Sequence, residues 1–154
     1  MLQDIQSHAT AFFKAHPMPT PMPRPIYSES VSCGHTGFAS PAQGYEQKTL
    51  DLNQHLVTNP PSTFYFRVKG NSMVKAGIHD GDMVIVDRSQ TPKSSSIVVA
   101  AVDGEWMVKR LYKRGAVVKL LSDSDDPSHK PVVFSEGQEL EVFGVVTYVI
   151  HKPT

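Results

Sequence analysis

The chain has 154 residues and a mass of 17.0 kDa, a size that allows one good hydrophobic core and predicts a single folded body. Fifteen Lys and Arg balance fifteen Asp and Glu, and no basic tract stands out, so direct sequence-specific DNA binding is not expected. The single Cys33 excludes an internal disulfide. The first thirty residues contain no apolar run long enough for a signal peptide or membrane helix. These features predict a cytoplasmic protein without a membrane segment.

Residues 1–45 have the composition of an extended N-terminal arm. Apolar residues between Leu2 and Phe13 recur near helical spacing and predict a short amphipathic helix before Pro17. Prolines then alternate over residues 17–25, which predicts an extended polyproline spacer. Small residues and glycines over residues 32–41 indicate a surface loop or a substrate-like segment.

Residues 46–154 show short strands divided by turn signals and predict a mostly β body. Phe64, Phe66 and Val68 alternate with polar residues and so share one strand face. The dipeptide Asp103-Gly104 predicts a type I′ hairpin turn. The predicted strands are residues 63–69, 83–86, 97–102, 105–112, 116–121, 132–134 and 140–150. This number of strands fits a small barrel or a folded sheet, with the acidic residues 123–126 in a solvated loop.

Two residues of this body could form a nucleophile and a base. Ser72 follows the first predicted strand in a turn that can hold its side chain outward, although Gly, Asn and Ser are also ordinary turn residues. Lys109 shares its strand face with Met107 and Leu111. Such surroundings would lower its pKa from about 10.4 towards 7 or 8 and let it accept a proton from a serine. The alternative is a lysine that extends to solvent from the strand edge.

The histidines give no sign of a metal site. Seven are scattered along the chain, and none has a histidine or cysteine partner at the spacing of zinc ligands. We therefore expect no metal and no cofactor.

The segments around Ser72 and Lys109 resemble the LexA/UmuD-like Ser-Lys self-cleaving peptidases. Residues 70–73 resemble the nucleophile motif of that family, and residues 108–111 resemble its general-base strand. The interval of 37 residues between Ser72 and Lys109 is the one expected for the catalytic pair. Further similar segments are residues 77–87, 97–105 and 142–146. The resemblance implies a LexA/signal-peptidase-like folded β-sheet body with Ser72 as nucleophile and Lys109 as general base.

The resemblance also implies that the substrate is a bond in the chain's own arm, cut before a glycine. The bond between Thr36 and Gly37 is favoured, because residues 37–42 resemble the sequence that follows the cut in the family. The alternative is the bond between Cys33 and Gly34, a residue pair that is also familiar there. These glycines could instead be ordinary loop residues.

The implied biological role is in the SOS response to DNA damage. The resemblance implies a homodimer that is cut when a RecA nucleoprotein filament forms, and a shortened form that serves a UmuC-type DNA polymerase as an accessory subunit in translesion synthesis. The arm is too short and too broken by prolines for a repressor's helix-turn-helix domain. The alternatives are a dimeric partner-binding module that acts without cleavage and a signal-peptidase-like enzyme that acts in trans.

Overall fold

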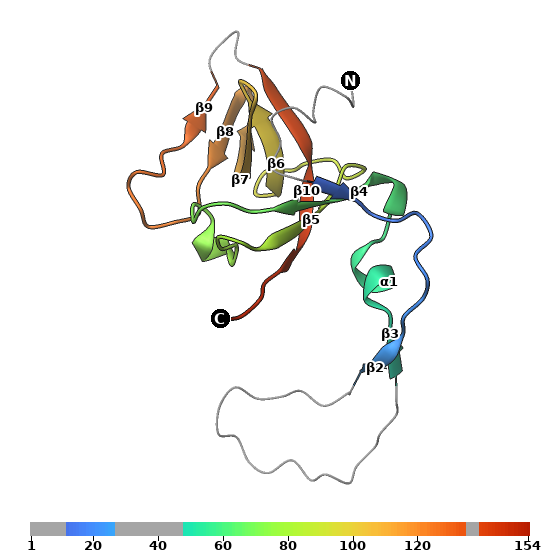
Figure 1. The fold of residues 1–154 in the computed structure, drawn as a ribbon. Coiled ribbons are helices and arrows are strands. Elements are labelled where there is room, and N and C mark those ends of the chain that lie inside the picture. Colours follow the sequence, from blue (N-terminus) through green and yellow to red (C-terminus); the bar gives the residue numbers. More distant parts are fainter. Residues whose placement is uncertain (1–11, 27–47, 135–138) are drawn as a thin grey trace.

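The computed structural model describes residues 12–26, 48–134 and 139–154. Their strands form an eight-stranded antiparallel sheet in the order β1-β4-β5-β10-β6-β7-β8-β9 and a separate pair of β2 with β3 (Figure 1). The strands are β1 Phe12–Lys14, β2 Arg24–Ile26, β3 Lys48–Leu50, β4 Thr63–Arg67, β5 Met83–Asp87, β6 Ile97–Val102, β7 Glu105–Arg114, β8 Val117–Leu121, β9 Val132–Val133 and β10 Leu140–Ile150. The helices are α1 Leu52–Leu56 and the 3₁₀ helices Pro60–Ser62 and Val74–Ala76. The mostly β prediction is confirmed, with an open folded sheet and no closed barrel among the described residues.

All seven strands predicted for the body are present. β6 and β10 have the predicted bounds, and the other five differ from prediction by one or two residues. Asp103 and Gly104 have φ values of 49° and 84°, as a type I′ turn requires at both central positions. This turn pairs Val102 with Glu105 and sets the register of β6 against β7.

β10 is the strand around which the sheet folds. Its first half pairs with β6 and its second half with β5, and the register shifts between Val142 and Gly144 and again between Val146 and Tyr148. Figure 1 shows β10 passing from the β6–β9 part of the sheet to the β4–β5 part. Irregularities of this kind bend a strand and increase its twist, so the two parts of the sheet can enclose a core.

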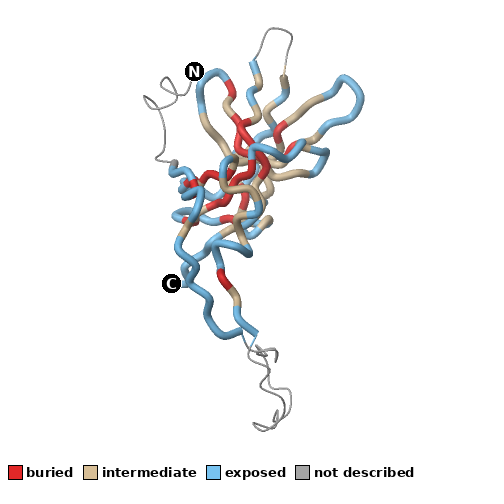
Figure 2. The backbone as a smooth tube through the Cα atoms, turned by 90° about the vertical axis from the view of Figure 1, so that its right-hand side faces the viewer, coloured by how far each residue is buried: buried red, intermediate tan, exposed pale blue. Residues whose placement is uncertain are grey.

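Folding of the sheet covers its central strands on both faces. Val99 of β6 packs in one hydrophobic cluster with Phe64, Phe66 and Val68, whereas Val98 packs in a second cluster with Leu111 and Leu120. Figure 2 shows the buried residues concentrated in the centre of the sheet and the β2–β3 pair largely exposed. This two-sided burial explains why the sequences of β5 and β6 are continuous apolar runs.

The helix predicted over residues 2–13 is wrong at its C-terminal end. Residues Phe12–Lys14 form β1, which pairs with β4 in the register Phe12 to Phe66 and Lys14 to Phe64. The backbone groups at the free edge of β4 gain partners in this way, and that tertiary pairing is invisible to a helical periodicity. Residues 1–11 lie outside the described ranges. The last two residues of the proline-rich segment, Arg24 and Pro25, lie in β2, which pairs with β3.

Candidate active site

The turn after β4 holds Ser72 between two fixed points. On one side, Gly70 adopts a φ of +89° and its N–H donates to Asp80 Oδ1 at 2.6 Å. On the other side, Met73 is buried in the first cluster, with only 2% of its surface exposed. Asn71 accepts a further bond from Asp80 N–H at 3.2 Å. Because the neighbouring residues are anchored, the half-buried Ser72 side chain is held at the end of the strand.

Lys109 of β7 reaches Ser72 directly. Its Nζ donates a hydrogen bond to Ser72 Oγ over 2.8 Å. Met107 and Leu111, which were predicted to share its strand face, both pack in the second hydrophobic cluster. Burial in these surroundings lowers the pKa of Lys109 below its ordinary value, because an ammonium loses hydration there. The structure therefore brings the two predicted residues into hydrogen-bonding contact, and burial makes Lys109 easier to deprotonate than an ordinary lysine.

Ser122 is a third member of the site that sequence reasoning missed. Lys109 Nζ donates to its Oγ over 2.8 Å, the same length as the bond to Ser72. Ser122 follows β8, whose Leu121 pairs with Arg110. Continuing that antiparallel register by one residue places Ser122 opposite Lys109. The register of the β7–β8 hairpin, and not a motif, is the signal that could have identified it.

The loop after β8 is more structured than its acidic sequence suggested. Asp125 and Asp126 are exposed, in agreement with the prediction of a solvated loop. Asp123 departs from that prediction, because its side chain is only 28% exposed and its Oδ2 pairs with Arg110 Nη2 at 2.5 Å. Arg110 Nε also donates to this carboxylate at 3.2 Å. The loop is thus attached to β7 immediately beside Lys109.

A cleft of about 150 Å³ opens over Ser72 and Lys109. Its walls are residues 66–70, from the end of β4 and the turn after it, and residues 106–109 of β7. Met73 and Val99 complete the lining. The lining thus combines apolar side chains with the Ser72 hydroxyl and with three basic side chains, those of Arg67, Lys69 and Lys109.

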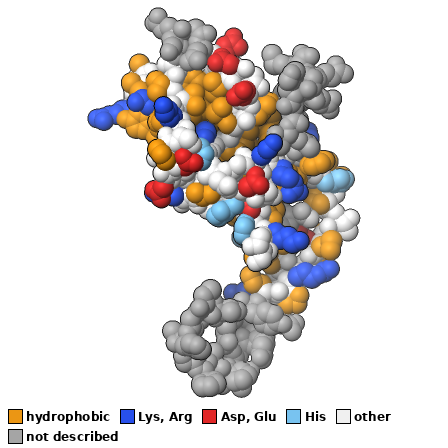
Figure 3. Space-filling model, turned by 60° about the vertical axis from the view of Figure 1, so that its left-hand side comes forward, with side chains coloured by type: hydrophobic (Ala, Val, Ile, Leu, Met, Phe, Trp, Pro, Cys, Tyr) orange, Lys and Arg blue, Asp and Glu red, His pale blue; other side chains and the backbone are white. Residues whose placement is uncertain are grey.

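The described surface adds two observations. On the face in Figure 3, Lys and Arg side chains lie at both sides with Asp and Glu between them, and they do not form one continuous basic patch.

Among the described helices, none is long and apolar enough to cross a membrane. The four residues of the two candidate cleavage bonds, Cys33, Gly34, Thr36 and Gly37, lie outside the described residues.

Comparisons with known proteins agree with this geometry. The family model described as Peptidase S24-like matches residues 25–147. Protein ImpA of Salmonella typhimurium is 39% identical over 129 residues, which cover 84% of each chain. Protein MucA of Escherichia coli is 40% identical over 124 residues, covering 80% of this chain and 82% of MucA. LexA repressor of Clostridioides difficile is 42% identical, but over only 57% of this chain and 41% of the repressor.

The range that the family model matches includes both Ser72 and Lys109. The similarity to ImpA and MucA extends along most of both chains, whereas the similarity to LexA covers only part of the repressor. The chain belongs to the Peptidase S24-like family of self-cleaving serine peptidases and is similar to its UmuD-like SOS mutagenesis proteins.

Proposed function

We propose that Ser72 and Lys109 are the catalytic dyad with which the chain cuts its own N-terminal arm, at the bond between Thr36 and Gly37. The bond between Cys33 and Gly34 is the alternative. The observation that supports this assignment is the 2.8 Å contact between Lys109 Nζ and Ser72 Oγ on the wall of an open cleft. In this proposal residues 1–45 are the arm that carries the substrate, and residues 46–154 are the peptidase and dimerisation body.

In the proposed reaction, neutral Lys109 takes the proton of the Ser72 hydroxyl as Oγ attacks the carbonyl carbon of Thr36. The tetrahedral intermediate collapses to an acyl-enzyme ester, and Lys109 gives the proton to the amine of Gly37 as it leaves. Water then attacks the ester, with Lys109 again as the base, and Ser72 is restored. In this proposal, backbone N–H groups near Ser72 form the oxyanion hole.

The cleft suits an extended segment with small side chains. Its volume of about 150 Å³ leaves little room for large residues at the scissile bond. The residues around both candidate bonds are mostly small, and each bond precedes a glycine. The strand end at 66–70 and strand β7 both line the cleft, so a chain bound there could present its carbonyl to Ser72 while its neighbours contact these lining residues.

The partners of the reaction are assigned from the UmuD-like relatives and belong to the same proposal. The chain acts as a cytoplasmic homodimer, and a RecA nucleoprotein filament on single-stranded DNA stimulates the cut. The shortened product then joins a UmuC-type DNA polymerase in translesion synthesis. Similarity to ImpA and MucA over most of the chain supports a role related to this polymerase.

Intact-mass analysis tests the dyad and the bond together. The purified full chain is incubated at about pH 10, where a lysine base is largely neutral. Fragments that end at Thr36, or at Cys33 for the alternative, are expected from the wild type and absent from Ser72→Ala and Lys109→Ala. Lys113→Ala is the matched control, because Lys113 is an exposed lysine of the same strand and its loss leaves cleavage intact.

Two results would overturn the proposal. If Ser72→Ala still releases the same fragments, another group is the nucleophile. If the wild type stays whole even with RecA, ATP and single-stranded DNA, a dimeric binding module that acts without cleavage becomes the better explanation. Rapid turnover of an added peptide would instead favour an enzyme that acts in trans.

A further inference from the structure

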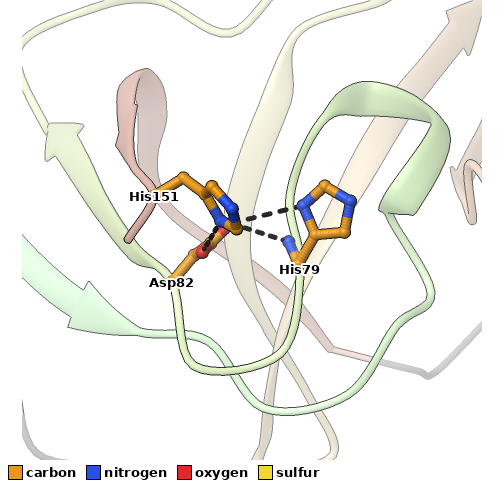
Figure 4. A group of neighbouring side chains, drawn as sticks. All are labelled: His79, Asp82 and His151. Carbon is orange, nitrogen blue, oxygen red and sulfur yellow. Dashed lines mark hydrogen bonds and ion pairs between the residues drawn. The ribbon is translucent and has the colours of Figure 1, made fainter. Parts of the chain in front are cut away.

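Three side chains outside the dyad converge at the end of the sheet: His79, Asp82 and His151 (Figure 4). His79 lies in the loop after the Val74–Ala76 helix, Asp82 directly precedes β5, and His151 directly follows β10. β5 and β10 pair with Ile150 opposite Met83. The same antiparallel register, continued by one residue, brings His151 opposite Asp82.

The geometry of this cluster is that of a fixed anion between two accessible imidazoles. The Asp82 side chain is 3% exposed, whereas each histidine side chain is 48% exposed. Asp82 Oδ1 lies 2.7 Å from His151 Nδ1, and Asp82 Oδ2 lies 3.6 Å from His79 Nδ1. One ligand atom from each residue can be chosen so that all three lie within 4.8 Å of one another.

The carboxylate is held in its charged form and in one orientation. Burial opposes ionisation of Asp82, but the hydrogen bonds from His79 N–H and from His151 outweigh it and hold the pKa of the carboxyl below its ordinary value. The bond from His79 N–H reaches Oδ2 at 2.8 Å. A hydrogen-bond donor to one carboxylate oxygen fixes the orientation of the whole group. The other oxygen, Oδ1, is therefore left directed at His151.

We propose that His79, Asp82 and His151 form a binding site for a divalent transition-metal ion, with zinc as the probe. Two imidazoles and one carboxylate are a ligand set that zinc accepts, with solvent in the open position. Metal–ligand bonds of about 2.0–2.2 Å in a tetrahedron separate neighbouring ligand atoms by roughly 3.3 Å. The 3.6 Å distance is to Oδ2 and the 2.7 Å distance is to Oδ1, so a single carboxylate oxygen reaches both imidazoles only after rotation of the half-exposed histidine side chains, whose ligand atoms already lie within 4.8 Å of one another and of the carboxylate.

A metal ion here would join the end of β10 to the segment that carries the nucleophile. His79 and Asp82 flank Asp80, whose carboxylate accepts the Gly70 N–H two residues before Ser72. The role is structural, since none of the three ligands lines the cleft over Ser72. The site therefore adds a cross-link between two chain segments that are far apart in the sequence, and it is independent of the proposed peptidase reaction.

Calorimetric titration of the full chain with ZnCl₂ tests this site. Cys33→Ser is the background for every sample, because a free thiolate also binds zinc. We expect saturable binding of one ion per chain, and a rise in thermal midpoint of roughly 5–10 °C when free zinc is 100-fold above the Kd. His79→Gln and His151→Gln should each weaken binding at least tenfold and remove that rise. Both histidines are half exposed, so these variants should fold.

His55→Gln is the matched control, since it removes an exposed histidine outside the cluster, and its zinc affinity should equal that of the background. If either His79→Gln or His151→Gln retains the background affinity, the three-ligand site is wrong. If the background shows no saturable binding, the cluster is only an ion pair between a buried carboxylate and its neighbours. Neither result bears on cleavage, which is measured separately by mass.

Discussion

The backbone N–H of Asp123 donates a hydrogen bond to the carbonyl oxygen of Ser72 at 2.8 Å. A second bond, from Lys75 N–H to the Asp123 carbonyl at 2.9 Å, follows immediately. The turn that carries Ser72 is thus paired with the first residues after β8, and the same residues include Ser122. These two backbone bonds join the segments that carry Ser72 and Ser122, the two serines that contact Lys109.

The ion pair between Asp123 and Arg110 should support the active site through this loop. Asp123→Ala removes the side-chain attachment to β7 and leaves the loop held by its backbone bonds to Ser72 and Lys75, so we expect self-cleavage to slow roughly three- to tenfold, as small misplacements of catalytic groups do. The rate of fragment formation measured by mass checks this. Asp125→Ala is the control, because that carboxylate is 85% exposed in its pair with Lys75. Equal rates for both variants would mean that the attachment is unimportant.

Ser122 should orient the lysine base. When Lys109 is neutral, its Nζ can keep donating one N–H to Ser122 Oγ and accept the Ser72 hydroxyl proton with its lone pair, which reverses the donor and acceptor of the 2.8 Å contact. Ser122→Ala removes this acceptor and should slow cleavage roughly tenfold, the effect of about one hydrogen bond. Ser122→Thr keeps the hydroxyl and should retain most of the rate. The pH dependence of the rate is the second readout, and an alanine variant that matches wild type in both readouts would contradict this role.

The pH dependence of cleavage should follow the protonation of Lys109. Burial lowers the pKa of this lysine, and only its neutral form can accept the Ser72 proton, so the rate rises as pH rises through the lowered pKa. We expect an increase between about pH 7 and pH 10 followed by a plateau. The measurement is the first-order rate of fragment formation at fixed ionic strength. A rate that is flat over this range would exclude Lys109 as the base.

Local patterns marked Ser72 and Lys109 as candidates, and the resemblance to the LexA/UmuD-like peptidases joined them as a predicted pair. Alternation along β7 placed Lys109 between Met107 and Leu111, and the turn after β4 marked Ser72. The continuous apolar runs likewise predicted β5 and β6, which are buried on both faces. Each of these inferences uses neighbours within one strand or hairpin, where side-chain direction follows directly from residue number.

The features that were missed depend on contacts between distant segments. β1 forms because β4 has a free edge with which it can pair. The sequence of residues 2–13 contains no signal for that pairing. Ser122 meets Lys109 only through the β7–β8 register. The histidine cluster joins His79 to His151 through the pairing of β5 with β10, whereas a search for metal-ligand spacing considers only near neighbours. Tertiary pairing, rather than local propensity, decides each of these.

Gly144 should be essential to the fold at the point where β10 turns from β6 to β5. A Cβ at this position would lie 2.8 Å from Val86 Cγ1 and 2.9 Å from the Asp87 carbonyl oxygen. The second contact is with backbone of a buried strand, which cannot rotate away as a side chain can. We therefore expect Gly144→Ala to lower the free energy of unfolding by roughly 1–3 kcal/mol, the usual cost of overpacking, as measured by urea denaturation.

Glu141→Ala is the control for this substitution, because Glu141 is an exposed residue of the same strand and should change stability by no more than about 0.5 kcal/mol. If Gly144→Ala were as stable as Glu141→Ala, the close approach of β10 to β5 would have to relax at little cost. The fold would then tolerate a wider spacing at its corner. In that case the register shift between Val142 and Gly144 would not depend on the absence of a side chain at residue 144. The bend of β10 would then arise only from its pairing with β6 and with β5.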